Sequence, residues 1–310
     1  MSAPDWLWIP VTIWAAFAQT LRNAAQRHLT AELGTLGATL VRFLYGAPFA
    51  ALWFVLVHRV GNQPVPAAGA LFGCWVALGA VCQIAATALL LRTMAERNFA
   101  LGVAYSKTEI IQVAVFALLF LGDRVTGVAA VAIALGTLGV LLLSPVDPAR
   151  PLRSFAIGWT DRPALLGLAS GACFALSAVG YRGAALALDQ APFLIAAAFT
   201  LLVAQLLQTA LLGGWLLLRD AAVIARVLRA WRPSVFAGLM GAAASAGWFT
   251  AMAIEPVAHV RTLGLVELLF SAVVSRRLFR ERLSGREWTG LGLLAAGMVV
   301  VTLRGVTLPG

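Results

Sequence analysis

Long apolar runs constrain this chain more than any other feature of its sequence. Ten such runs lie between charged residues and Pro or Gly punctuation, at residues 6–28, 35–58, 67–91, 98–121, 125–144, 163–186, 191–218, 234–254, 257–279 and 287–304. A helix needs roughly 20 apolar residues to cross about 30 Å of hydrocarbon, whereas the strands of a membrane barrel alternate polar and apolar residues over short segments. The sequence therefore predicts an all-α polytopic membrane protein with ten transmembrane helices, integral to the cytoplasmic (inner or plasma) membrane.

The charged residues point to a membrane rather than to nucleic acid. Only 12% of residues are charged, 61% are hydrophobic, and the net charge is +10. The arginines cluster in short loops without interleaved aromatic residues, so we expect them to contact anionic membrane lipid and to set orientation. Counting arginines in the loops and toward the ends of the runs beside them, sixteen fall on one side of the predicted membrane and five on the other. The positive-inside rule then predicts both termini on the non-cytoplasmic side.

The chain also carries a faint repeat at an offset of 158 residues. Glu109 matches Glu267, residues 122–127 (GDRVTG) match residues 280–285 (RERLSG), and Gly139 matches Gly297. The longest polar connection separates the halves, so we predict a first five-helix repeat at 1–148, a linker at 149–162 and a second repeat at 163–310. Because each half has an odd number of spans, equivalent spans run in opposite directions. Such inverted repeats place a site near the membrane midplane at their interface.

No residue pattern indicates an enzyme. The sequence has no HExxH motif, no Gly-rich phosphate loop and no cluster of His and Cys. The cysteines, Cys74, Cys82 and Cys173, lie in apolar runs without metal-ligand spacing. We therefore expect no enzymatic activity, no metal and no cofactor.

Glu109 and Glu267 are the leading candidate site residues. Each lies about halfway along its apolar run, where an ionised carboxylate costs about 2.5 to 3.5 kcal/mol on insertion scales and is a functional candidate by default. The stretch around Glu109 is unusually polar, with Tyr105, Lys107 and Gln112. On a continuous helix Lys107 and Glu109 are about 200° apart and cannot pair with each other. We expect Tyr105, Glu109 and Gln112 to face a cavity, and Lys107 to find another partner.

Arg42 is a second deep cation, inside the run at 35–58. A buried guanidinium needs a carboxylate or several carbonyls, so Arg42 either forms a fixed ion pair with Glu109 or Glu267, or binds a substrate carboxylate or phosphate. Gln19 and Arg22 lie on one face of the first run, which lines a cavity or cements helices. His259 and Arg261 fall near the start of the ninth run, and we assign them no role.

The sequence resembles the EamA family of the drug/metabolite transporter superfamily. The resemblance rests on residues 119–126 (LFLGDRVT), followed by Gly136 and Gly139, and on residues 278–284 (LFRERLS), followed by Gly290, Gly292 and Gly297. It implies two inverted five-helix repeats and movement of small organic solutes, commonly export of amino acids or other metabolites.

Two features differ from this family. Glu109 and Glu267 stand where the family usually has a proline, so the sequence gives no proline to kink the fourth and ninth helices. Ten-span members usually have both termini in the cytoplasm, opposite to the prediction from the arginines.

We therefore predict a secondary transporter, an exporter of a small polar or amphipathic, amino-acid-like metabolite that works by alternating access and is coupled to protons or to a counter-substrate. One alternative is an exchanger or facilitator of anionic solutes, with Arg42 and Lys107 leading. Another is a non-transporting, lipid-binding or assembly membrane protein. The expected partners are a small-molecule substrate and membrane lipid, with no nucleic acid.

Overall fold

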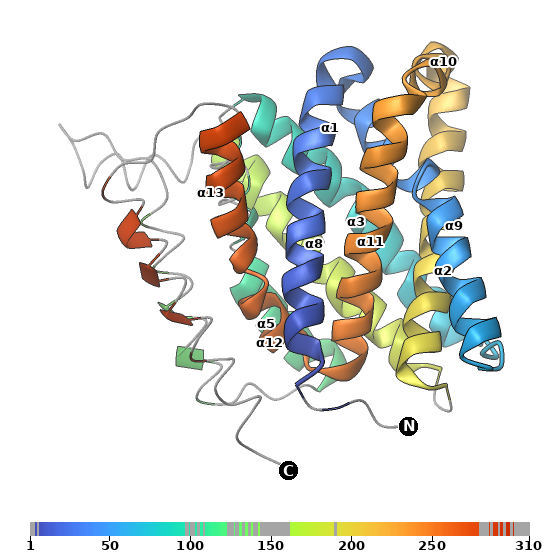
Figure 1. The fold of residues 1–310 in the computed structure, drawn as a ribbon, viewed down its shortest axis with the longest axis vertical. Helices are drawn as coiled ribbons and strands as arrows, with labels where there is room; N and C mark the ends of the chain where they lie inside the picture. The colour runs from blue at the N-terminus through green and yellow to red at the C-terminus, as the bar shows by residue number, and fades with distance from the viewer. Residues whose placement is uncertain are drawn as a thin grey trace.

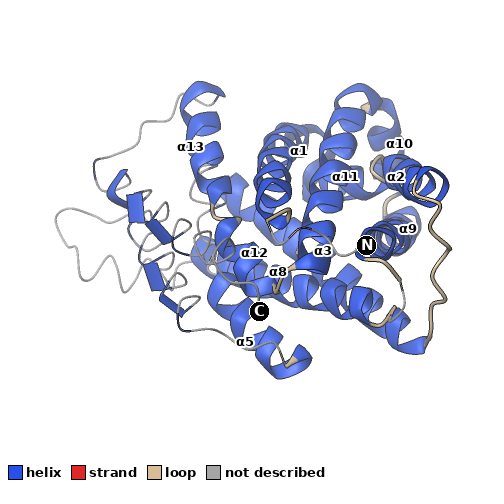
Figure 2. Cartoon of the chain, turned by 60° about the horizontal axis from the view of Figure 1, so that its bottom comes forward, coloured by secondary structure: helices blue, strands red, loops and turns tan. Residues whose placement is uncertain are grey.

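The computed structural model describes residues 4, 6–96, 99, 103, 106–107, 109–122, 162–188 and 191–278, with scattered positions in 127–142 and 285–300. These residues are helical or connect helices, and the described part contains no strand (Figure 2). Tyr105, most of the fifth and tenth predicted spans, and nearly all of the predicted linker lie outside the described residues.

The first two predicted spans form one long helical stretch. Helix α1 covers Trp8–Leu44 and α2 covers Ala47–Val60, with non-helical backbone at Gly34, where φ is 69° and ψ is 172°. A straight helix of 53 residues would be about 80 Å long at 1.5 Å per residue, far more than a bilayer core. The stretch therefore crosses twice: the chain rises through α1, turns at the top and returns to α2 (Figure 1).

Four further long helices match the predicted spans closely. They are α3 (Ala70–Glu96), α8 (Arg162–Leu186), α9 (Phe193–Arg219) and α11 (Trp231–Ile254). Between α9 and α11, in a stretch outside the predicted spans, the structure has a short helix, α10 (Ala221–Arg229). It buries Val223 and Val227 against the bundle while Arg229 stays exposed. This helix was not predicted from the sequence because its amphipathic pattern is short, and hydropathy alone assigns such a stretch to a loop.

The ninth predicted span is two helices rather than one. Helix α12 covers Val257–Leu263 and α13 covers Val266–Leu278, with a turn at Gly264 and Leu265 between them. In the fourth predicted span, helix α5 covers Glu109–Leu121, and Lys107 lies in a turn before it. Both glutamates thus lie just after a break in the helix, although no proline occupies either place.

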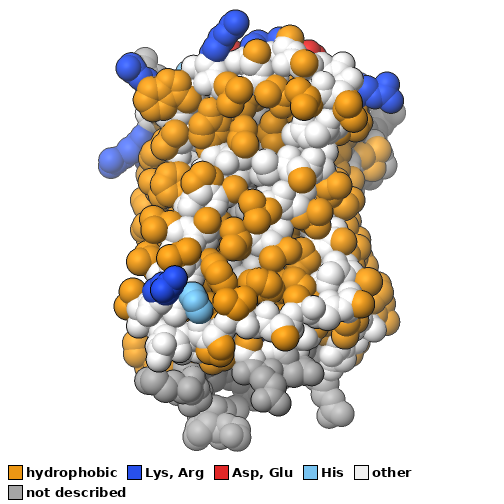
Figure 3. Space-filling model, turned by 90° about the vertical axis from the view of Figure 1, so that its right-hand side faces the viewer, with side chains coloured by type: hydrophobic (Ala, Val, Ile, Leu, Met, Phe, Trp, Pro, Cys, Tyr) orange, Lys and Arg blue, Asp and Glu red, His pale blue; other side chains and the backbone are white. Residues whose placement is uncertain are grey.

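The surface of the bundle confirms that the protein crosses a membrane several times. Six helical stretches in the described part are long and apolar enough to span a bilayer, counting Trp8–Val60 as one. Large apolar side chains such as Leu52, Leu71 and Leu218 are exposed, and Figure 3 shows apolar atoms over the middle of one face with most Lys and Arg near its top. Soluble proteins rarely expose an apolar surface of this extent. The chain is an integral, multi-pass membrane protein.

Candidate functional site

Glu109 and Glu267 occupy equivalent places at the starts of two helices. Glu109 is the first residue of α5 and Glu267 the second of α13, and their exposed fractions are 2% and 1%. The turns before them also match, since Ile110 N donates to Lys107 O at 3.3 Å and Leu268 N donates to Leu265 O at 2.8 Å. A helix N-terminus stabilises a nearby carboxylate through its unpaired N–H groups and its dipole. Both buried carboxylates are therefore stabilised in the same way, by the N-terminus of the helix that each begins.

Lys107 connects the two carboxylates. Its Nζ lies 2.5 Å from Oε2 of Glu267 and 3.6 Å from Oε1 of Glu109. The prediction that Lys107 and Glu109 cannot pair was wrong, because it assumed a continuous helix and Lys107 lies in a turn. All three side chains are almost completely buried, so their mutual attraction is weakly screened by solvent.

The polar face of the first span binds Glu267. Gln19 Nε2 donates to Glu267 Oε2 at 2.7 Å, and Asn23 Nδ2 donates to Oε1 at 2.9 Å. Gln19 in turn accepts a hydrogen bond from Nε1 of Trp248 at 2.9 Å, and Arg22 donates to Oδ1 of Asn23 at 2.6 Å. Gln19 and Arg22 were predicted to belong to a functional or cementing face. Asn23 was missed, although it immediately follows Arg22.

Arg261 is the residue that sequence reasoning wrongly set aside. Its Nη1 lies 3.5 Å from Oε1 of Glu109, and its guanidinium lies over the ring of Trp248 at 4.8 Å from the centroid. The prediction placed it near the membrane boundary because it treated residues 257–279 as one straight span. In the structure nearly all of α12 is buried, so this segment lies inside the protein. His259 bonds Glu255 and takes no part in the cluster.

Arg42 is buried but has no carboxylate partner among the described residues. Its Nη1 donates to Thr87 Oγ1 at 2.9 Å and its Nη2 to Ser245 Oγ at 3.4 Å. Of the two alternatives predicted for Arg42, the fixed ion pair with Glu109 or Glu267 is therefore absent from this structure. Gln112 lies one turn after Glu109 on α5, half-buried, and its Oε1 has no hydrogen-bond partner in the described part of the chain.

A second polar group extends the site toward α8 and α9. Tyr181 Oη donates to Gln83 Oε1 at 3.0 Å, and Gln208 Nε2 donates to the same oxygen at 2.7 Å. Thr87, which accepts from Arg42, donates to the backbone oxygen of Gln83 at 2.9 Å. Hydrogen bonds therefore connect Arg42 to three further helices.

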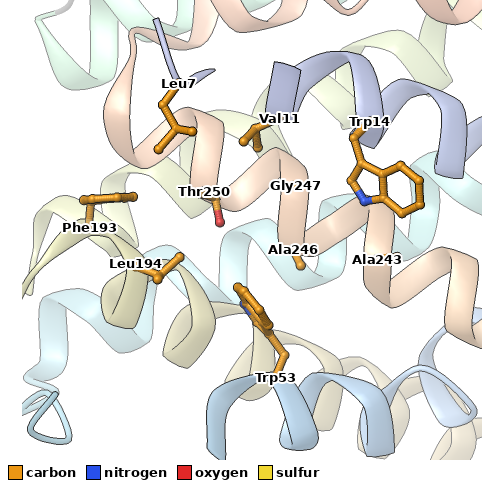
Figure 4. A pocket seen from close by; sticks show the side chains of 10 residues that line it. All are labelled: Leu7, Val11, Trp14, Trp53, Phe193, Leu194, Ala243, Ala246, Gly247 and Thr250. Carbon is orange, nitrogen blue, oxygen red and sulfur yellow. The ribbon is translucent and has the colours of Figure 1, made fainter. Parts of the chain in front are cut away.

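An apolar cavity lies on the other side of α11. Its volume is about 430 Å³, and its lining includes Trp14, Trp53 and Phe193, with Thr250 as a polar contributor (Figure 4). None of the described residues that line it is charged. Whereas Gly241 and Ser245 of α11 face the arginines, the cavity is lined by other residues of that helix. A site without charge offers no basis for coupling or for recognising an ion, so the charged cluster is the candidate functional site.

Comparisons with known proteins bear on the family and on the fold. Residues 162–303 match the model of the EamA-like transporter family. A crystal structure of another protein is similar, with a TM-score of 0.66 at 15% sequence identity over 98% of each chain. At that identity the likeness shows a shared fold alone. No curated protein matches the chain.

Proposed function

Because residues 162–303 match the model of the EamA-like transporter family, we propose that this chain is a secondary transporter. It exports a small polar or amphipathic, amino-acid-like metabolite from the cell across the inner or plasma membrane by alternating access. One observation carries the proposal: Lys107 joins two buried carboxylates, each just after a break in its helix. Transporters commonly place coupling and substrate groups at broken helices near the midplane.

The helix packing supports two inverted repeats. The most extensive packing in the described part is between α1 and α11 and, equally, between α3 and α8. In the predicted repeat, the first span, which forms the beginning of α1, corresponds to α8, and α3 corresponds to α11. Exchanging the halves therefore converts one pair into the other. Two related halves that rock against each other would separate at these contacts and at the carboxylate cluster.

The cluster suits a coupling role. Lys107 belongs to the first predicted half and Glu267 to the second, so their ion pair crosses the interface that alternating access has to rearrange. A proton or a substrate charge arriving at either glutamate would weaken its attraction to Lys107 and favour opening. Ionisable groups inside membranes recur in proton and ion pathways for this reason.

A second candidate function is exchange or facilitated diffusion of anionic solutes. Four buried cations, Lys107, Arg22, Arg42 and Arg261, accompany two buried carboxylates in the described part of the site. This excess of positive charge favours a solute that brings negative charge.

Flux through the purified protein in proteoliposomes tests the proposal and separates the candidates. Uptake stimulated by an imposed pH gradient supports proton coupling, and stimulation only by internal substrate supports exchange. Flux into inside-out cell vesicles tests the export direction. If no member of a broad metabolite panel moves, the proposal fails and a lipid-binding or assembly role takes its place.

A further inference from the structure

Two arginines in the cluster lack the partners that buried arginines need. Arg22 is 0% exposed and Arg42 is 2% exposed. Neither pairs with a carboxylate in the described part of the chain, in contrast to Lys107 and Arg261, which both contact Glu109. The Nε and Nη1 atoms of Arg22 and the Nε atom of Arg42 are buried without a hydrogen-bond partner there. Buried unpaired donors on a charged group are costly.

The two side chains converge on one spot of α11. A Cβ atom added to Gly241 would lie 3.2 Å from Cγ of Arg42 and 3.4 Å from Cδ of Arg22. Gly241 thus lets both arginine stems pack against the same stretch of backbone, although their like charges repel at this burial. Both arginines belong to α1: Arg22 lies before the non-helical backbone at Gly34, and Arg42 lies after it.

The groups around the pair are suited to an oxyanion. Arg42 Nη2 donates to Ser245 Oγ at 3.4 Å, which leaves the Ser245 hydroxyl hydrogen free to donate to a ligand. A guanidinium presents several N–H donors in a fixed plane and binds carboxylate or phosphate through two of them at once. A negative group here would satisfy unpaired donors and relieve the repulsion between the two cations.

We propose that Arg22 and Arg42, with the Ser245 hydroxyl, bind an oxyanion of the transported solute, either a carboxylate or a phosphate. The inference rests on the proposed transport function, since it names the part of the solute that this function needs. Lys107 and Arg261 do not share this role, because the carboxylates already hold them.

Ligand pairs that differ only in the oxyanion test the site. Thermal stabilisation of the purified full-length protein is measured with α-amino acids against their carboxamides, and with sugar phosphates against the free sugars. A ligand that binds the folded protein raises its unfolding temperature. The proposal predicts stabilisation by the oxyanion member of at least one pair and not by its neutral counterpart. The pair that responds identifies carboxylate or phosphate.

Variants that keep the charge test the residues. Arg22→Lys and Arg42→Lys retain a cation but lose the planar fork, and each is expected to weaken oxyanion binding at least about tenfold. Gly241→Ala keeps both arginines but crowds their side chains. It therefore provides a third variant for measuring oxyanion binding if a lysine variant folds poorly. Arg229→Lys, on the exposed face of α10, is the matched control and should bind as the wild type does.

Three results would overturn the oxyanion site. They are equal stabilisation by both members of every pair, stabilisation by no oxyanion in the panel, or wild-type binding in Arg22→Lys and Arg42→Lys together. Failure of the transport proposal can be distinguished from failure of the oxyanion site. In that case oxyanions would still bind, the Arg22 and Arg42 variants would still weaken this binding, and no solute would cross the proteoliposome membrane. Conversely, solute flux unchanged in both lysine variants would leave transport standing and remove the oxyanion site.

Discussion

Lys107 Nζ lies 2.5 Å from Oε2 of Glu267, so a turn in the first predicted half is joined by an ion pair to a helix start in the second. Both breaks in the helices are needed for this contact. The turn at Lys107 lets its side chain reach both glutamates, and the turn at Gly264 and Leu265 places Glu267 at the beginning of α13. The relationship makes the lysine the centre of the buried charge cluster.

Replacing this lysine should destabilise the protein strongly. Lys107→Met leaves Glu109 without its lysine partner and Glu267 with only two amide donors. Removing one partner of a buried pair costs about 3 to 5 kcal/mol. The measurement is thermal unfolding in detergent. The double variant Lys107→Met, Glu267→Gln should recover much of the loss, and an unchanged melting temperature in Lys107→Met would contradict the buried pair.

The two glutamates should differ in their contribution to stability. Glu267 accepts from Gln19 at 2.7 Å and Asn23 at 2.9 Å as well as pairing with Lys107, whereas the contacts of Glu109 are long, at 3.5 and 3.6 Å. We expect Glu267→Gln to cost roughly 3 kcal/mol and Glu109→Gln roughly 1 kcal/mol. Unfolding of the two variants side by side decides this, and the reverse order would show that the polar face of α1 contributes little.

Arg261 should act together with Glu109. Arg261→Gln and Glu109→Gln remove opposite ends of one contact, so their effects should not add. A double-mutant cycle on the melting free energy is expected to give a coupling of about 0.5 to 3 kcal/mol. His259→Gln on the same helix is the control, since His259 bonds Glu255 instead. If the effects of the Arg261 and Glu109 variants on the free energy of unfolding were fully additive, the two side chains would not interact.

Gly264, in the turn between α12 and α13, packs closely against Trp248. A Cβ added there would lie 2.5 Å from Cη2 of Trp248, which is too close for a side chain. Gly264→Ala should therefore destabilise the protein by about 1 to 3 kcal/mol through overpacking. Gly214 in α9 has no atom within 4 Å of such a Cβ, so Gly214→Ala is the matched control and should be neutral or stabilising. Equal melting temperatures for the two variants would contradict close packing at Trp248.

The orientation of the chain can be tested by cysteine labelling. Arg229 on α10 and Arg59 near the end of α2 are exposed, and Figure 1 shows α10 at the top of the bundle and the end of α2 at the bottom. The arginine distribution predicts that Arg229→Cys is protected from a membrane-impermeant thiol reagent in intact cells, whereas Arg59→Cys reacts. Both variants are made without the native cysteines. The opposite pattern would favour the orientation usual in the family.

The long helices were predictable from the sequence because each depends on a local property, an apolar run of sufficient length. The candidate carboxylates were predictable for a similar reason, since Glu109 and Glu267 are expensive wherever a membrane span places them. The pairing of Lys107 was not predictable, because the turn at Lys107 changes the direction of its side chain, and the sequence has no proline there to indicate that turn.

Arg261 and Asn23 were missed for a related reason. Their roles come from contacts between helices far apart in sequence, Arg261 with α5 and Asn23 with α13. Periodicity identifies the face of a helix but not the partner of that face. Arg42 illustrates the converse case, since its burial was predicted correctly while its hydroxyl partners lie on α3 and α11.

Glu109→Gln tests most directly whether the carboxylate cluster takes part in transport, because this variant is expected to fold. Solute flux is measured in proteoliposomes that contain equal amounts of folded wild-type and Glu109→Gln protein, with Arg229→Lys as control. We expect a melting temperature near that of the wild type and a flux reduced by at least about tenfold, because the variant removes an ionisable group of the kind that forms ion pathways inside membranes. Wild-type flux in Glu109→Gln would contradict this expectation.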